Sequence, residues 1–120
     1  MRFLAILALL FPILAFAAPP SSVLTWTPAT TRVDGTTISG VLTFNVYRGV
    51  GAGNESTTPY LTGLTGTTYT DSTGIANGTT VCYQMTEVET ATGLESARTN
   101  EACKTFPASP PSAPTNLTVK

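Results

Sequence analysis

The chain has 120 residues, of which 42% are hydrophobic and only 11% charged, with a formal net charge of −1 and no histidine. Such a length suffices for one domain. The sparse lysines and arginines exclude nucleic-acid binding through clustered phosphate contacts, and the lack of histidine removes the commonest general base and zinc ligand. Threonine supplies 24 residues and favours strands, so the composition predicts an all-β domain.

Residues 1–17 have the pattern of a secretory signal peptide. Arg2 precedes about 15 apolar residues, and Ala15-Phe16-Ala17 supplies a small-x-small cleavage site. The apolar run is shorter than the roughly 20 residues of a spanning helix, and Pro12 interrupts it. We therefore predict a signal-peptide helix that is cleaved after Ala17, with no stable membrane insertion afterwards. An uncleaved anchor is the alternative.

Beyond residue 17, short β-type runs alternate with turn residues, which is typical of a sandwich or barrel. The predicted strands cover residues 23–27, 41–48, 57–62, 67–71, 78–88 and 97–106. Pro59 makes the third of these an edge strand, because proline cannot donate to a central ladder. Side chains alternate between the two faces of a strand. The predicted core residues are Leu24, Trp26, Phe44, Val46, Tyr69, Val81, Tyr83 and Met85.

The two cysteines, Cys82 and Cys103, are predicted to form a disulfide, because exported chains meet an oxidising environment. Two buried free thiols are the alternative. A bond between these neighbouring strands would close a loop of about 20 residues and stabilise the domain by about 3 kcal/mol. Alternation predicts that Cys82, Gln84 and Thr86 point away from the core.

The order of these segments resembles a fibronectin type III domain of the bacterial and bacteriophage kind. The resemblance runs from Val23 to Phe106 through VLTWTPATTRVDG, VLTFNVYRG, TTYTDSTGIANGTTVCYQMTEV and GLESARTNEACKTF. Trp26 stands where that family keeps its core tryptophan, whereas Val81 stands at the position of the family's corner tyrosine. The resemblance implies an immunoglobulin-like antiparallel β-sandwich over residues 18–106.

One strand of that family is out of place in this chain. The family's first strand, strand A, should precede residues 23–27, but only about five residues separate them from the signal segment. A strand-A-like sequence lies instead at the end of residues 107–120, after a proline-rich linker, and includes Pro114, Leu117 and Val119. This segment could fill its own sandwich, be donated to a neighbouring subunit as an added strand, or stay disordered as the remnant of a second domain.

The acidic residues suggest structural roles, and we predict no enzyme, metal or cofactor. Asp34 and Asp71 flank turns, where aspartate normally accepts local hydrogen bonds. Glu87 and Glu89 lie two apart on one strand and are predicted to share an exposed acidic face, with Glu87 near Arg98 across the hairpin.

The sequence thus predicts an exported, non-enzymatic binding or adhesion module that meets a protein or carbohydrate surface ligand. Its contact candidates are the loops at residues 30–40 and 49–58. The GVGAGN run in the second loop lacks the Lys-Ser/Thr of a phosphate loop and is predicted to be a flexible hairpin. The alternative is a structural protein of a surface fibre or virion that donates its C-terminal strand to a neighbouring subunit. The expected location is secreted, periplasmic or cell-surface, or on a virion.

Overall fold

The computed structural model describes residues 17–120, so the predicted signal peptide lies almost wholly outside the described residues. Within the described part, no helix is long and apolar enough to cross a membrane. All of the elements there are strands. They are β1 (Ser22–Thr25), β2 (Leu42–Val50), β3 (Leu61–Leu64), β4 (Thr68–Asp71), β5 (Thr80–Glu89), β6 (Leu94–Glu95) and β7 (Ala102–Thr105).

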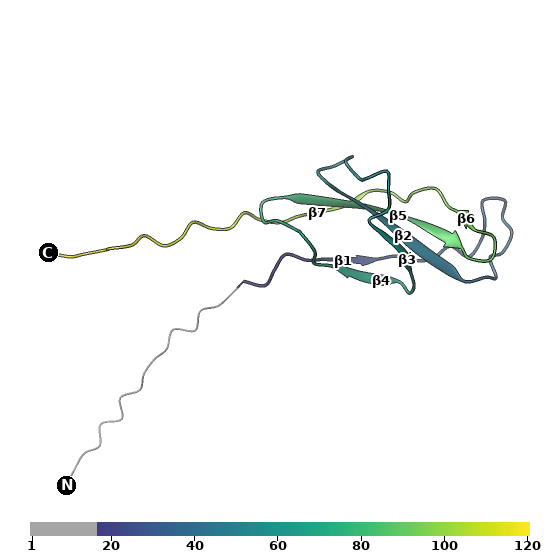
Figure 1. Cartoon of the computed structure of the whole chain (residues 1–120), viewed down its shortest axis with the longest axis horizontal. Coiled ribbons are helices and arrows are strands. Elements are labelled where there is room, and N and C mark those ends of the chain that lie inside the picture. The colour runs from purple at the N-terminus through teal and green to yellow at the C-terminus, as the bar shows by residue number, and fades with distance from the viewer. Residues whose placement is uncertain (1–16) are drawn as a thin grey trace, which may run out of the picture.

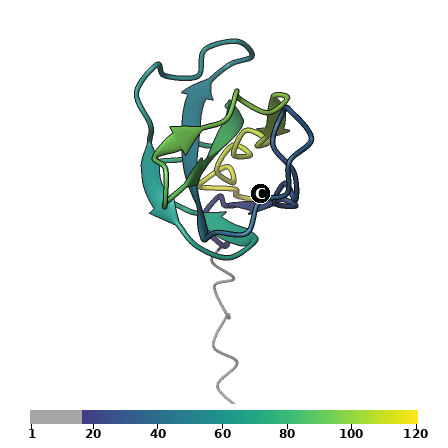
Figure 2. The same cartoon turned by 90° about the vertical axis from the view of Figure 1, so that its right-hand side faces the viewer.

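The strands form two antiparallel sheets, which confirms the all-β prediction at this level. The smaller sheet is β1 paired with β4, from Ser22 opposite Asp71 to Thr25 opposite Thr68. In the larger sheet β2 lies between β3 and β5, and the other edge of β5 pairs with β6 and then with β7. Figure 1 shows the β1–β4 pair lying across the larger sheet, and Figure 2 looks along the molecule onto the end that carries β6.

The core fills the space between the two sheets, because alternate residues of β2 and β5 point toward β1 and β4. The residues Leu24 and Trp26 reach it from the β1 side, and the Trp26 ring lies 5.3 Å from that of Phe44. Tyr69 is half-buried on β4, outside the main cluster. The fully buried apolar cluster is Phe44, Val46, Val81, Tyr83, Met85 and Phe106, with Leu42, Leu61, Leu64 and Ile75 packed against it.

Two strands differ from their predicted bounds by more than two residues. The predicted edge strand at 57–62 is observed at Leu61–Leu64, because Pro59 has no N–H and pairing resumes only where the Tyr60 N–H reaches the Val46 carbonyl at 2.7 Å.

The predicted last strand at 97–106 is shortened to β7, and β6 lies before its predicted start. Between them hydroxyl groups replace backbone acceptors: Ser96 Oγ accepts from Glu87 N at 3.0 Å, and Thr99 Oγ1 accepts from Met85 N at 3.0 Å. These side chains interrupt the regular ladder.

The outer face of β5 is covered, which corrects the expectation that Cys82 and Thr86 are exposed. Cys82 is 0% and Thr86 4% exposed. Gly53, in the loop after β2, donates its N–H to Glu101 Oε2 at 2.6 Å. Because β5 lies between β2 and β7, this contact crosses over β5 near Cys82. The loop is therefore folded onto the sheet, and is not the flexible hairpin that its glycines suggested.

The segment after β7 does not return to the sheets. Phe106 is buried, and its carbonyl and that of Pro107 accept from Gly78 N at 2.9 and 3.1 Å. Further along, Leu117 and Val119 are 95% and 97% exposed, and Figure 1 shows the segment leaving the domain at the end where β1 begins. Pro114 and the residues after it therefore do not fill the position beside their own β1, which was one of the predicted alternatives.

Candidate functional site

The loop between β1 and β2 is a small ordered hairpin. A bridge joins Thr31 to Thr37, and the Arg32 N–H donates to the Thr36 carbonyl at 2.8 Å. Asp34 Oδ1 accepts from Thr36 N at 3.0 Å and from Thr36 Oγ1 at 2.6 Å, and these bonds lower the pKa of Asp34. Gly35 follows with a φ of 85°, which glycine adopts without strain. The local hydrogen-bonding role predicted for Asp34 is confirmed.

An ion pair fastens this hairpin to the end of β5. Arg32 binds Glu89 with both arms of its guanidinium, Nη2 to Oε1 at 2.5 Å and Nε to Oε2 at 3.1 Å. Glu89 is only 7% exposed, and this hydrogen bonding to Arg32 holds the pKa of its carboxyl below its ordinary value. Bidentate pairing fixes orientation as well as distance. Arg32 therefore sets the position of the hairpin against the larger sheet.

The prediction that Glu87 and Glu89 share a face is confirmed, but the prediction that this face is exposed is wrong for Glu89. Glu87 and Glu89 do share the side of β5 that faces Phe44 and Leu42 across the pairing with β2. Glu89 is buried in its ion pair, while Glu87 Oε2 accepts from the Ala29 N–H at 3.1 Å.

The predicted proximity of Glu87 and Arg98 is also wrong. The Arg98 guanidinium lies 3.7 Å from the centre of the Tyr47 ring, and its Nη2 donates to the Ser56 carbonyl at 2.9 Å. Cation–π attraction holds it over the outer face of β2, on the side away from the core. The spacing of residues in the sequence could not show that Arg98 would bind the Tyr47 ring on the opposite face from Glu87.

An apolar cavity of about 510 Å3 opens between this hairpin and the β5–β6 turn. Ile38 and Leu42 lie in it, while Val33 and Leu94 stand at its rim with 110% and 63% exposure. The wall also holds Glu87, Asp34, Glu95 and the paired Arg32 and Glu89, and no aromatic residue lines the cavity. At this end of the sheets, exposed aliphatic side chains therefore lie beside several carboxylates. We call Val33, Ile38, Leu42, Glu87 and Leu94 the loop-end surface.

The other predicted contact loop, at residues 49–58, lies at the opposite end of β2 and cannot share one surface with the first. It is held close to the sheet: a Cβ on Gly49 would collide with the backbone of Asn54. The carboxyl groups of Glu55 and Glu101 interact there, which raises the pKa of Glu55 and lowers that of Glu101. This loop therefore packs against its own sheet and is the weaker contact candidate.

Asp71 has a larger role than the turn-forming one predicted for it. Its carboxylate is 1% exposed and pairs with Arg48 on β2, with Nη1 and Oδ2 3.0 Å apart. It also accepts from Tyr83 Oη at 2.8 Å, Tyr60 Oη at 3.3 Å and Thr73 N at 3.2 Å. With its acceptor capacity used in this way, Asp71 links the two sheets and has no free face for a substrate.

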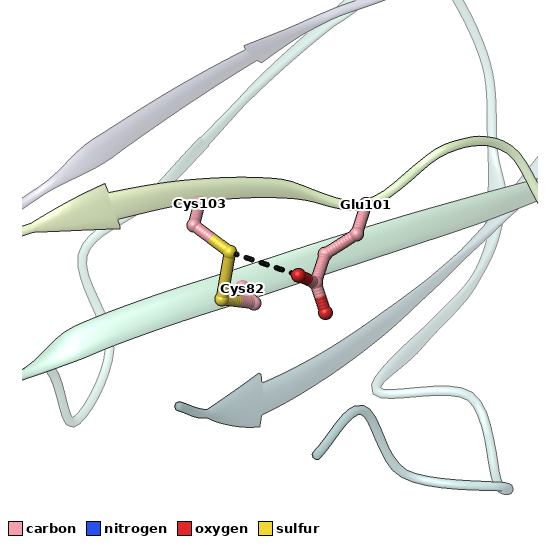
Figure 3. Close-up of side chains that lie close together, drawn as sticks. All are labelled: Cys82, Glu101 and Cys103. Atoms are coloured by element: carbon pink, nitrogen blue, oxygen red, sulfur yellow. Dashed lines mark hydrogen bonds between the residues drawn. A yellow bond between two sulfur atoms is a disulfide. The ribbon is translucent and has the colours of Figure 1, made fainter. Parts of the chain in front are cut away.

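The disulfide lies on the outer face of the larger sheet. Cys82 on β5 is bonded to Cys103 on β7, directly opposite in register, as predicted. Figure 3 shows Glu101 beside this bond, with Oε1 3.4 Å from Cys103 Sγ. Cys82, Glu101 and Cys103 lie close enough together to hold a metal ion. Both sulfurs are bonded in the disulfide, however, so these two cysteines offer no thiolate to a cation.

Comparison with protein-family models, with curated proteins and with solved structures finds no match. The loop-end surface must therefore be interpreted from its own chemistry. Its residues come from the β1–β2 hairpin, β2, β5 and β6. The sequence marked the hairpin as a contact loop and Glu87 as an acidic residue, but it did not show that they meet. The pairing of Glu89 with Arg32 gave no signal in the sequence, because the two residues are 57 positions apart.

Proposed function

We propose that this chain is an exported, non-enzymatic binding module of the fibronectin type III kind, and that it meets a protein partner through the loop-end surface. The single observation that carries the proposal is the apolar cavity with Val33 and Leu94 exposed at its rim. Isolated exposed aliphatic residues are common, but two around one cavity offer an anchoring point of the kind found at the centres of protein interfaces.

The architecture, the signal-peptide pattern and the disulfide support this proposal. Two antiparallel sheets that pack face to face are the arrangement which the family resemblance implies. A signal-peptide pattern at residues 1–17 and a disulfide are what an exported chain would carry.

The lining of the cavity favours a protein partner over a carbohydrate. Ile38, Leu42 and Leu94 are aliphatic, and the cavity offers no aromatic face on which a sugar ring could stack. In the described residues no lysine or arginine pairs with Glu87. We therefore expect the partner to insert an apolar side chain beside a lysine or arginine, because that charge would complement Glu87.

The proposal is tested by matched charge substitutions at the two ends of the sheets. Val33→Asp and Leu94→Asp place a carboxylate on the loop-end surface, whereas Val50→Asp changes a 60% exposed valine at the opposite end of β2. The labelled mature chain is titrated onto arrayed cell-envelope proteins and onto a glycan array. We expect binding to envelope proteins that weakens about tenfold or more in V33D and L94D but not in V50D. Equal binding by all variants, binding to glycans alone, or no binding on either array would refute the proposal.

A further inference from the structure

A second opening lies on the side of the molecule where both sheets have a free edge. Among the described residues β1 pairs only with β4, and β7 only with β5. A cavity of about 450 Å3 runs between β1 and β7, with Tyr83 and Met85 in its lining. Lys104 Nζ donates to the Ser21 carbonyl at 2.6 Å and so joins the two walls at the end where β1 begins. We call this opening the edge groove.

One residue that lines the edge groove, Trp26, carries an unsatisfied polar group. Its indole Nε1 is buried without a hydrogen-bond partner among the described residues. A buried N–H without an acceptor is costly, and native proteins rarely leave one. The free edge of β1 adds a row of unpaired backbone groups, which attracts a further strand. An added strand would bring backbone carbonyls to this edge, and one of them could accept from the Trp26 indole.

Residues 114–120 have the properties of such a strand. Leu117 and Val119 are two apart, so an extended backbone places both on one face, and both are almost fully exposed in the free chain. Seven residues extend over about 23 Å, which is longer than the four-residue β1. Asn116 has a φ of 59° and must become extended on pairing, a change that asparagine tolerates in both directions.

The path of the chain favours a second copy over the same copy. The segment leaves β7 at the end where β1 begins, as the contact between Lys104 and Ser21 and Figure 1 both show. A strand antiparallel to β1 must enter at the other end, beside Trp26. The connecting residues 107–113 include three prolines and reach about 22 Å when extended. Such a linker is stiff and points away from the domain, so it would have to reverse to reach its own groove.

We propose that Pro114–Lys120 of one copy adds to β1 of another copy as an antiparallel strand, with Leu117 and Val119 in the edge groove. The donor end of one molecule then meets the loop end of the next, and the contact repeats. A head-to-tail contact of this kind builds an open linear assembly unless its rotation closes a ring. The strand pairing itself uses the β1–β7 side, and the residues that line the edge groove include none of the loop-end surface.

The single tryptophan of the chain provides a direct assay, because Trp26 lines the groove. The mature chain is diluted over a wide concentration range while its mass is followed by sedimentation and its Trp26 emission by fluorescence. We expect mass to rise with concentration and the emission to shift to shorter wavelength in parallel. Leu117→Asp should weaken association by about tenfold to a hundredfold, since a buried leucine is lost. Thr118→Asp, on the opposite face of the same segment, is the matched control and should associate like the unaltered chain.

A synthetic peptide of residues 112–120 provides the second measurement. Added to the L117D protein, it should restore the emission shift, whereas the same peptide with aspartate at position 117 should not. A chain that stays monomeric with unchanged emission would overturn the proposal. So would an emission shift that is independent of concentration and lost in L117D, because that result means that each chain fills its own groove.

Discussion

Asp71 is predicted to be the most sensitive polar position of the fold, and Asp71→Ala tests this. The carboxylate is 1% exposed and its Arg48 partner has a side-chain exposure of 13%. Removing one member of a buried ion pair typically costs about 3–5 kcal/mol, because the other charge is left without compensation. Arg48 keeps its bond to the Thr73 carbonyl at 2.7 Å, which places the ion-pair loss near 3 kcal/mol. The orphaned Tyr83 hydroxyl adds about 1 kcal/mol.

Urea unfolding followed by Trp26 fluorescence measures this loss. With a slope of about 1.5 kcal/mol/M, a loss of about 4 kcal/mol lowers the midpoint by roughly 2–3 M. Asp34→Ala is the matched control, because Asp34 is exposed and bonds only to Thr36 within its turn. That variant should lose about 1 kcal/mol or less. The double variant Arg48→Met with Asp71→Leu should recover part of the loss, since neither charge remains buried. If D71A loses no more stability than D34A, the ion pair does not hold the two sheets together.

Three further predictions concern the disulfide, the Arg32–Glu89 ion pair and the hydroxyl of Tyr83. Replacing Cys82 and Cys103 together by serine opens a loop of 21 residues and should cost about 3 kcal/mol, or roughly 12–24 °C in Tm by calorimetry; an unchanged Tm would contradict this. Arg32 lowers the pKa of Glu89 below 4.5, so the pair adds stability that is present above about pH 4.5 and lost as the pH falls through the lower folded pKa. Arg32→Gln should therefore flatten the acid limb of the stability profile, and a profile as steep as that of the unaltered chain would argue against the ion pair. Burial raises the pKa of Tyr83 from 10.0 to about 12, so its neutral form adds stability that is present below pH 10 and lost as the pH rises through 12. Tyr83→Phe should show a shallower alkaline loss in the same denaturation assay, and an equally steep loss would refute this assignment.

Much of the fold could be predicted because it depends on local alternation. The period-two pattern located the long strands near their observed positions. The pattern is informative because a shift of one residue in the pairing would turn Phe44 and Val46 from the core toward solvent. Phe106 was not recognised as core, because it follows the last strand and is buried by contacts that alternation does not describe. The late start of the last strand, β7, was equally hidden, since it depends on the bond that the Thr99 hydroxyl accepts from Met85 N in the folded chain.

The candidate site was much less predictable. Arg32 and Glu89 meet only once the β1–β2 hairpin is placed against the end of β5. The burial of Asp71 depends on Arg48, Tyr60 and Tyr83, which lie on other segments of the chain. A sequence shows that an aspartate follows a strand, but it does not show which distant cation will share its environment. The sequence therefore did not predict electrostatic partners that are far apart in the chain, whereas it did predict that Asp34 accepts hydrogen bonds within its own turn.

The most direct test of how these molecules associate is an intermolecular nuclear Overhauser measurement on a mixed sample. Isotope-labelled and unlabelled mature chains are combined, and only contacts between different molecules are selected. Strand donation predicts cross-peaks between the Leu117 methyl groups of one chain and the Trp26 indole of another. Cross-peaks that appear only within single molecules, or none between Leu117 and Trp26 at a concentration where the mass has risen, would contradict strand donation.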